Sequence, residues 1–270
     1  MKPSILVPVD FTDNAFNAYL YANNLAYYLD CDLHLLHIAD SNFSEAREER
    51  KSLEDRLRSF SSWRPNEVSK KFYPVGTSVE VAAGKVVDEI LSASNREVFR
   101  FIVCASRDQH TIRDRWLGTI SSEIALNAPI PVILVPKSAE FKDINAIVVG
   151  CDEHAKDENV LSHLAVISDW FESKVYFAHV KESSDHKFVA VEKDILDMLL
   201  ALKKRSFNVE MIYLEGIDVV NALFSFTTRI KADLMVMVSE KRNFLQRLLF
   251  QSVSRKAALE TSVPTMIMNI

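Results

Sequence analysis

The strongest constraint on the fold is that the chain contains one pattern of strands and helices twice. The segment ILVPVD, which ends at Asp10, matches IVVGCD, which ends at Asp152, and LHLLHI matches VYFAHV at the same separation of 142 positions. Repeats of this length are duplicated domains rather than the short units of a solenoid. We therefore expect a first domain over residues 1–139 and a second over residues 140–270.

The end of each half repeats as well, at a separation of 133 positions. FIVCAS, which ends at Ser106, matches LMVMVS, which ends at Ser239, and Pro131 matches Pro264. The separation is shorter than at the start of the halves. We therefore expect the first half to carry a longer segment between its second and third strands.

Each half alternates short apolar runs with helical patterns. Runs such as FIVCA and LMVMV lack polar alternation, which is typical of strands buried on both faces of a parallel sheet. Strand–helix–strand order with short connections predicts right-handed crossovers. The sequence thus predicts an α/β fold with two doubly wound, parallel, five-stranded sheets and helices on both faces, a Rossmann-like architecture.

The predicted elements of the first half are strands near 4–9, 32–39, 69–75, 100–105 and 131–136 and helices near 13–29, 43–60, 79–95 and 118–127. The predicted strands of the second half lie near 145–150, 174–180, 208–214, 233–238 and 264–269.

The composition limits the classes of partner that we expect for the chain. A net charge of −5 provides no basic field of the kind that duplex DNA or an anionic membrane attracts, so we expect no nucleic-acid partner. No apolar run approaches the roughly 20 residues of a membrane helix. The N-terminal sequence reads as a strand rather than a signal peptide, and the three cysteines, Cys31, Cys104 and Cys151, lack metal-ligand spacing. We therefore expect a cytoplasmic protein without membrane association.

Five glycines are too few and too widely spaced for the common phosphate-binding loops. The closest pair, Gly76 and Gly84, is eight positions apart, so neither G-x-G-x-x-G nor a Walker A loop can occur. The sequence also offers no metal-ligand set and no arrangement of nucleophile, base and orienting residue. We expect no catalytic residue, no metal and no required cofactor.

Three segments together resemble the universal stress protein family. They are the opening strand ending in V-x-D, the second strand ending in LLHI, and the closing run RWLGTISSEIALNAPIPVILVP over residues 115–136; LLFQSVSRKAALETSVPTMIM over 248–268 is similar. The resemblance implies two tandem domains of the adenine nucleotide alpha hydrolase-like fold. It also implies an intramolecular pseudo-dimer joined through residues 131–136 and 264–269, with a further homodimer as an additional expectation.

Family members that bind ATP carry the motif G-x2-G-x9-G-[ST]. In the first half its positions hold Ala105, Asp108 and the pair Gly118-Thr119. Glycines let backbone N–H groups approach a phosphate closely, and Asp108 instead places a carboxylate beside the expected triphosphate. The first half therefore carries a degraded nucleotide-binding motif.

The second half keeps no glycine of the motif. Its positions hold Val238, Lys241 and the pair Gln251-Ser252. ATP or AMP is therefore expected in the first domain only. By resemblance, Asp10 lies near the nucleotide and Ile38 offers backbone groups to adenine. The positions implied for nucleotide binding are Pro8, Val9, Asp10, Ile38, Ala105, Arg107, Asp108, Gly118, Thr119, Ile120 and Ser121.

Structural roles remain open for several of these residues. Asp10 and Asp152 also suit loop structure or the capping of the helices that follow them, with Thr12 and Asp13 helping in the first half. Thr119 suits a helix N-cap. A helix beginning at Thr119 and Ser121 favours an anion through its free N–H groups and dipole. The arginines before it, such as Arg107, suit either a phosphate contact or a solvated loop.

Two further features have structural interpretations. His37 and His179 each lie near the end of a buried strand, which favours hydrogen-bonded core histidines. The charged segment 43–60 carries Leu53, Leu57 and Phe60 on one stripe, which predicts a solvated outer helix; a partner-binding helix is the alternative.

Two functions compete on these grounds. The first is a non-enzymatic stress-response module that binds a protein or small-molecule signal and retains only a degraded nucleotide motif. The second is adenine-nucleotide binding through the first domain, with slow hydrolysis. An enzyme of another nucleotide-dependent α/β family is disfavoured because the phosphate loops are missing.

Overall fold

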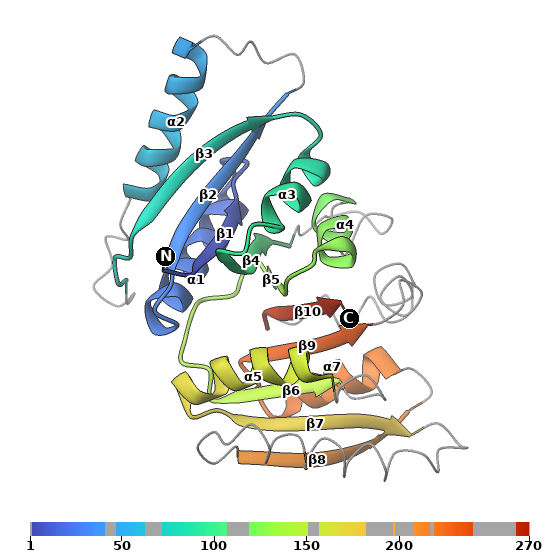
Figure 1. Cartoon of the computed structure of the whole chain (residues 1–270). Helices are drawn as coiled ribbons and strands as arrows, with labels where there is room; N and C mark the ends of the chain where they lie inside the picture. Colours follow the sequence, from blue (N-terminus) through green and yellow to red (C-terminus); the bar gives the residue numbers. More distant parts are fainter. Residues whose placement is uncertain are drawn as a thin grey trace. The chain divides into compact units, whose positions relative to one another are not determined.

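A computed structural model describes residues 2–40, 47–62, 72–106, 119–150, 157–181, 197, 208–216, 219–239 and 263–269. Within this part, the chain divides into two compact units (Figure 1). The first unit ends at Phe141 and the second begins at Lys142.

The first unit is a parallel sheet covered by helices. Its strands are β1 (Ser4–Pro8), β2 (Asp32–Ala39), β3 (Thr77–Ala83), β4 (Phe99–Ala105) and β5 (Val132–Val135). They run in the order β3-β2-β1-β4-β5, and each neighbouring pair is parallel. The helices are α1 (Asp13–Tyr28), α2 (Arg47–Ser62), α3 (Val86–Ser94) and α4 (Thr119–Asn127). In Figure 1, α1 and α2 lie on one side of these strands and α3 and α4 on the other.

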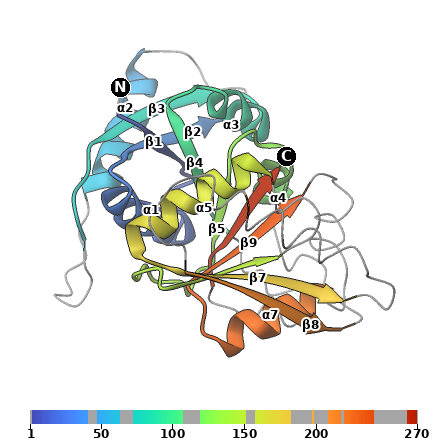
Figure 2. The same ribbon diagram turned by 60° about the horizontal axis from the view of Figure 1, so that its bottom comes forward.

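The second unit repeats this topology. Its strands are β6 (Ala146–Gly150), β7 (Lys174–Lys181), β8 (Asn208–Glu215), β9 (Leu234–Ser239) and β10 (Thr265–Asn269). They run in the parallel order β8-β7-β6-β9-β10. The described helices are α5 (Glu158–Phe171) and α7 (Val219–Arg229), and α7 packs against β6, β7 and β8 (Figure 2). Numbered within each unit, both sheets have the strand order 3-2-1-4-5, which confirms the duplicated, doubly wound fold.

The apolar runs explain why these strands are central. Successive side chains of a strand point to opposite faces of the sheet, so a run of buried residues requires cover on both faces. Three consecutive residues in the first strand of each unit are fully buried: Ile5, Leu6 and Val7 in β1, and Ile147, Val148 and Val149 in β6. The prediction of doubly covered parallel sheets from unbroken apolar runs is confirmed.

The prediction for the third strand was wrong. It placed a strand at 69–75 and a helix over 79–95, whereas β3 begins at Thr77 and α3 at Val86. Residues 69–71 lie outside the described residues, and 72–75 form no strand. Pro74 has no N–H for a strand ladder, which opposes a strand there. Gly84, with φ of +148°, separates β3 from α3 in a backbone conformation that is open mainly to glycine.

Helix α2 is the charged outer helix that the sequence predicts. Leu57 is fully buried, Leu53 and Phe60 are half-buried, and most of the charged side chains are exposed. The helix also covers β3, which is the edge strand of its sheet. Arg50 Nη2 donates a 2.9 Å hydrogen bond to the carbonyl oxygen of Val81 in β3. Such cover reduces the ability of an edge strand to pair with another chain.

No helix in the described ranges combines the length and the apolar character needed to cross a membrane.

Three helices are followed by a non-glycine residue in the left-handed conformation. Asp30, Glu172 and Lys231 follow α1, α5 and α7 with φ values of 49°, 52° and 55°. A residue with a side chain is about 1–2 kcal/mol less stable in this conformation than in the right-handed one. Glycine is the usual residue at the position that follows a helix, because it adopts the left-handed conformation without this free-energy cost. The scarcity of glycine therefore leaves conformational strain at the ends of these helices.

Replacing Glu172 by glycine removes that strain at the end of α5. Glu172→Gly should raise the free energy of unfolding by about 0.5 kcal/mol, since the relief of strain only modestly exceeds the cost of the extra conformational entropy that glycine gives the unfolded chain. Glu172→Ala is the control, because alanine keeps the unfavourable φ. Urea denaturation measures both variants, and equal stability of the two would contradict this explanation.

Candidate functional site

A cavity of about 170 Å³ opens at the carboxyl ends of β1, β2 and β4. β1 lies between β2 and β4, so the strand order reverses direction there. Ligands of open α/β sheets bind at this switch point. The volume is well above the about 15 Å³ that one water molecule needs. The cavity is therefore the candidate ligand site of the first unit.

Most of the sequence-predicted site residues meet at this cavity. Those in its lining are Pro8, Val9, Asp10, Ile38, Ala105, Ile120 and Ser121. Thr119 is the first residue of α4, so it begins the helix rather than preceding it as a cap. Arg107, Asp108 and Gly118 lie outside the described residues. The assignment of all these positions to nucleotide binding stays a prediction.

The inner wall of the cavity is apolar. It is formed by Leu36, Val86, Ile90, Cys104 and Ile124, together with some of the predicted residues. Four of these five side chains are buried in the fold. Burial raises the pKa of the Cys104 thiol to about 12 and that of Cys31 to about 11, so neither thiol is activated as a nucleophile. A ligand seated on this wall requires an apolar body.

Asp10 and Thr12 form a hydrogen-bonded polar part of the rim. Asp10 Oδ1 accepts hydrogen bonds from the Thr12 backbone N–H at 3.1 Å and from the Thr12 hydroxyl at 2.6 Å. The Thr12 hydroxyl oxygen in turn accepts from the N–H of Ala15 and caps α1. The structural role considered for Asp10 is thus found in a modified form: Thr12 is the N-cap of α1, and Asp10 orients the Thr12 hydroxyl.

The capping role considered for Asp152 is not tested by the structure. Asp152 lies outside the described residues, and α5 begins six positions later. Its N-cap is Asp157, which accepts hydrogen bonds from the N–H groups of Asn159 and Val160.

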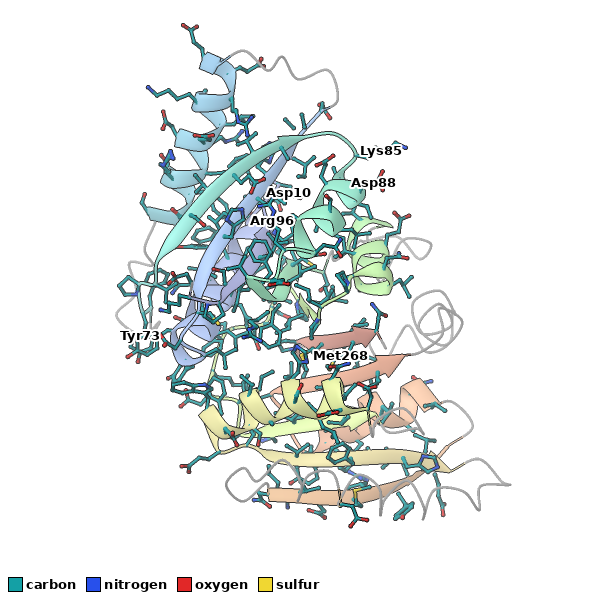
Figure 3. The ribbon with its side chains drawn as sticks, viewed as in Figure 1. Asp10, Tyr73, Lys85, Asp88, Arg96 and Met268 are labelled. Atoms are coloured by element: carbon teal, nitrogen blue, oxygen red, sulfur yellow. The ribbon has the colours of Figure 1, made fainter. Side chains whose placement is uncertain are left out.

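Three helices begin around the cavity. Ala15 lies in the first turn of α1, Val86 is the first residue of α3, and Ser121 lies in the first turn of α4. Figure 3 shows Asp10 together with Lys85 and Asp88 at the start of α3. Helix N-termini favour negative charge, whereas the Asp10 carboxylate opposes it. The site therefore suits a ligand with an anionic group near the helices and a hydrogen-bond donor near Asp10.

His37 also lines the cavity, which the sequence did not indicate. Its Nδ1 lies 2.8 Å from the carbonyl oxygen of Val9, so Nδ1 carries the proton and donates. The ring is hydrogen-bonded, as predicted, but it is half-buried in the cavity wall. His179 is buried, in agreement with a core histidine. The position of His37 near the carboxyl end of a strand was the signal that could have placed it in the site.

A second polar cluster joins β2, β3 and the end of α3. His34 Nδ1 lies 2.8 Å from the Ser78 hydroxyl, and His34 Nε2 lies 2.9 Å from the Glu80 carboxylate. Arg96 donates two hydrogen bonds of 2.6 and 2.8 Å to Glu80. The sequence showed no such alignment of hydroxyl, imidazole and carboxylate. Because Arg96 already neutralises Glu80, we interpret the cluster as an ion-pair network that fixes the edge of the sheet.

The described part of the chain contains no group of three or more histidine, cysteine, aspartate or glutamate side chains arranged to hold a metal ion.

The network makes stability depend on pH. The hydrogen bonds from Arg96 hold the pKa of Glu80 at about 2, below its ordinary 4.5, and burial lowers the pKa of His34. A carboxyl group whose pKa is lower in the folded chain than in the unfolded chain stabilises the fold at pH values above its ordinary pKa. This stabilisation is lost as the pH falls towards the pKa of the folded state. For Glu80 this window runs from about pH 4.5 to about pH 2.

Glu80→Gln should therefore reduce the loss of stability in that window. At pH 7 we expect it to lower the free energy of unfolding by about 1 kcal/mol, because Arg96 loses its charged partner but its half-exposed side chain remains solvated. Urea denaturation between pH 7 and pH 2.5 measures both effects. Glu97→Gln, at an exposed position nearby, is the control. An acid response of Glu80→Gln identical to that of the original chain would contradict this origin of the pH dependence.

The double role of Thr12 gives a further test. Thr12→Ala should lower the free energy of unfolding by about 1 kcal/mol, because α1 loses its cap and Asp10 loses a donor. Thr12→Ser keeps the hydroxyl and should stay within about 0.5 kcal/mol of the original chain. Thermal denaturation compares the two, and equal losses would show that the hydroxyl does not stabilise the rim.

Comparison with known proteins supports the fold. A sequence model of the universal stress protein family matches residues 1–136 and 144–269. A universal stress protein from Archaeoglobus fulgidus is similar in structure, with a TM-score of 0.68 at 16% identity, covering 98% of this chain and 96% of its own. A putative universal stress protein from Pseudomonas aeruginosa gives a TM-score of 0.60 at 15% identity, covering 99% and 93%. No curated protein sequence matches the chain.

Proposed function

The chain belongs to the universal stress protein family, and from this premise we propose that it is a cytoplasmic, non-enzymatic signal-binding module of two paired domains. The cavity of the first domain receives a small molecule, and its occupancy is the signal that a partner protein reads. Pairing through residues 131–136 and 264–269 belongs to the same proposal.

The observation that carries this proposal is the composition of the cavity at the switch point between β1 and β4. An apolar wall, the Asp10–Thr12 rim and the first turns of three helices surround one space. Ligand pockets combine a largely apolar lining with a few placed polar groups in this way. Seven of the residues in the lining are those that the family resemblance implies for a ligand.

The non-enzymatic part of the proposal rests on the sequence of the motif. Ala105 and Asp108 occupy the positions of two glycines that bring backbone N–H groups to phosphate in ATP-binding relatives. A carboxylate at Asp108 repels a triphosphate, while a ligand with less negative charge is repelled less. We therefore expect binding without turnover.

An adenine nucleotide is the second candidate for the ligand. The apolar wall suits an adenine ring, and Asp10 is an acceptor at the rim for a ribose hydroxyl. The N-termini of the helices around the cavity favour a phosphate group at a distance from Asp10. Because Asp108 opposes accumulated negative charge, we expect AMP to bind more tightly than ATP.

The test is a titration of the purified protein with AMP and with ATP, followed by thermal denaturation and an assay for released phosphate. We expect AMP to raise the melting temperature, with no phosphate released from ATP. Release of phosphate over many turnovers would contradict a non-enzymatic module. If neither nucleotide shifts the melting temperature, the adenine-nucleotide candidate is wrong and the ligand belongs to another class.

Matched variants test whether the ligand binds in the cavity of the first domain. Ala105→Leu adds three carbon atoms to the cavity lining and should remove binding, whereas Ala83→Leu adds the same atoms at an exposed strand end and should not. Gly118→Val should also abolish binding, while a change at Gln251 should have no effect. Equal sensitivity at Gly118 and Gln251 would show that both domains bind.

A further inference from the structure

We propose that Arg56, on α2, is a positioning residue for the cavity: through the ring of Phe11 it holds the loop between β1 and α1 in the conformation that brings Asp10 and Thr12 to the rim. This inference rests on the proposed function of the cavity. Arg56 itself does not line the cavity.

The backbone at Phe11 requires support from its surroundings. Phe11 has φ of +61°, in the left-handed region, which costs about 1–2 kcal/mol for a residue with a side chain. Its two neighbours in sequence, Asp10 and Thr12, both line the cavity, and the hydrogen bonds between them span Phe11. The strained residue therefore sets how the two rim groups face each other.

Contacts of the Phe11 ring supply this support. The guanidinium carbon of Arg56 lies 3.9 Å from the ring centroid, within the range of a cation–π interaction. The ring of His37 lies at 4.7 Å between centroids and that of Phe60 at 5.9 Å. Two of these three groups, Arg56 and Phe60, belong to α2, so the position of α2 determines the position of Phe11.

Helix α2 is itself held at both ends. Near its start, Arg50 donates to the carbonyl of Val81, and at its end the Tyr19 hydroxyl donates a 2.7 Å hydrogen bond to the carbonyl of Ser61. Leu57, between these points, is fully buried. A helix fixed in this way is a rigid support for the loop between β1 and α1. No residue of α2 is among those that line the cavity.

The arrangement makes ligand binding and α2 docking mutually dependent. If the contact between Arg56 and Phe11 favours the loop conformation that binds, a bound ligand must stabilise that contact by the same factor. The family motif does not include α2, so this coupling is a property of the contacts in this chain.

The first arm of the test needs no ligand. Amide hydrogen exchange of the segment from Val9 to Ala15 is compared between the original chain, Arg56→Ala and Arg56→Met, which keeps the stem without the charge. We expect both variants to exchange roughly three- to fivefold faster there, the range of a partly exposed cation–π contact. Arg58→Ala is the control, because Arg58 lies on the same helix and forms ion pairs with Glu54 and Asp55 of that helix.

The outcomes of this arm are distinct. Faster exchange in both Arg56 variants, with melting temperatures within a degree or two of the control, supports the positioning role. Unchanged exchange in this segment overturns it. Equal acceleration in Arg58→Ala also overturns it, because the effect would then come from the general charge of α2.

The second arm uses AMP as the probe. In the original chain AMP should slow exchange in α2 residues 53–62, and Arg56→Ala should weaken AMP binding by about the factor seen in the exchange of the loop. If AMP does not bind to the original chain, the nucleotide candidate fails while the first arm still decides the role of Arg56. If AMP binds equally well to Arg56→Ala, the positioning role is wrong and the proposed function stands.

Discussion

Parallel pairing of β1 with β2 on one side and β4 on the other is the interaction on which the rest of the first unit depends. It buries Ile5, Leu6 and Val7 completely and brings the carboxyl ends of three strands to one edge. The crossovers required between parallel strands then start α1, α3 and α4 at that edge. The cavity is a geometric consequence of this pairing.

The same pairing recurs in the second unit, where β6 lies between β7 and β9. Strand order and burial match closely between the units, because any chain with this topology must bury its central strands. The positions that would bind phosphate match poorly, since no glycine of the motif remains in the second half. The duplication has thus retained the requirements of folding in both halves, whereas a part of the glycine motif, Gly118-Thr119, remains in the first half only.

Sequence reasoning reached the fold because unbroken apolar runs identify buried parallel strands. Seven of the sixteen residues that line the cavity were named in advance, and these came from the family resemblance. Sequence reasoning failed at β3, an edge strand whose mixed pattern of exposure has no strong periodicity. It also missed His37 as a wall residue and the contact of Phe11 with Arg56. Both depend on how side chains from separate elements meet, which spacing along the chain does not encode.

We propose that the two domains share one scaffold and that only the first carries a ligand site. Native mass spectrometry of the intact chain at increasing AMP concentration tests this proposal, because it counts bound molecules. A single site predicts saturation at one AMP per chain, with no bound AMP in Ala105→Leu. Saturation at two AMP per chain, or one that persists unchanged in Ala105→Leu, would contradict it.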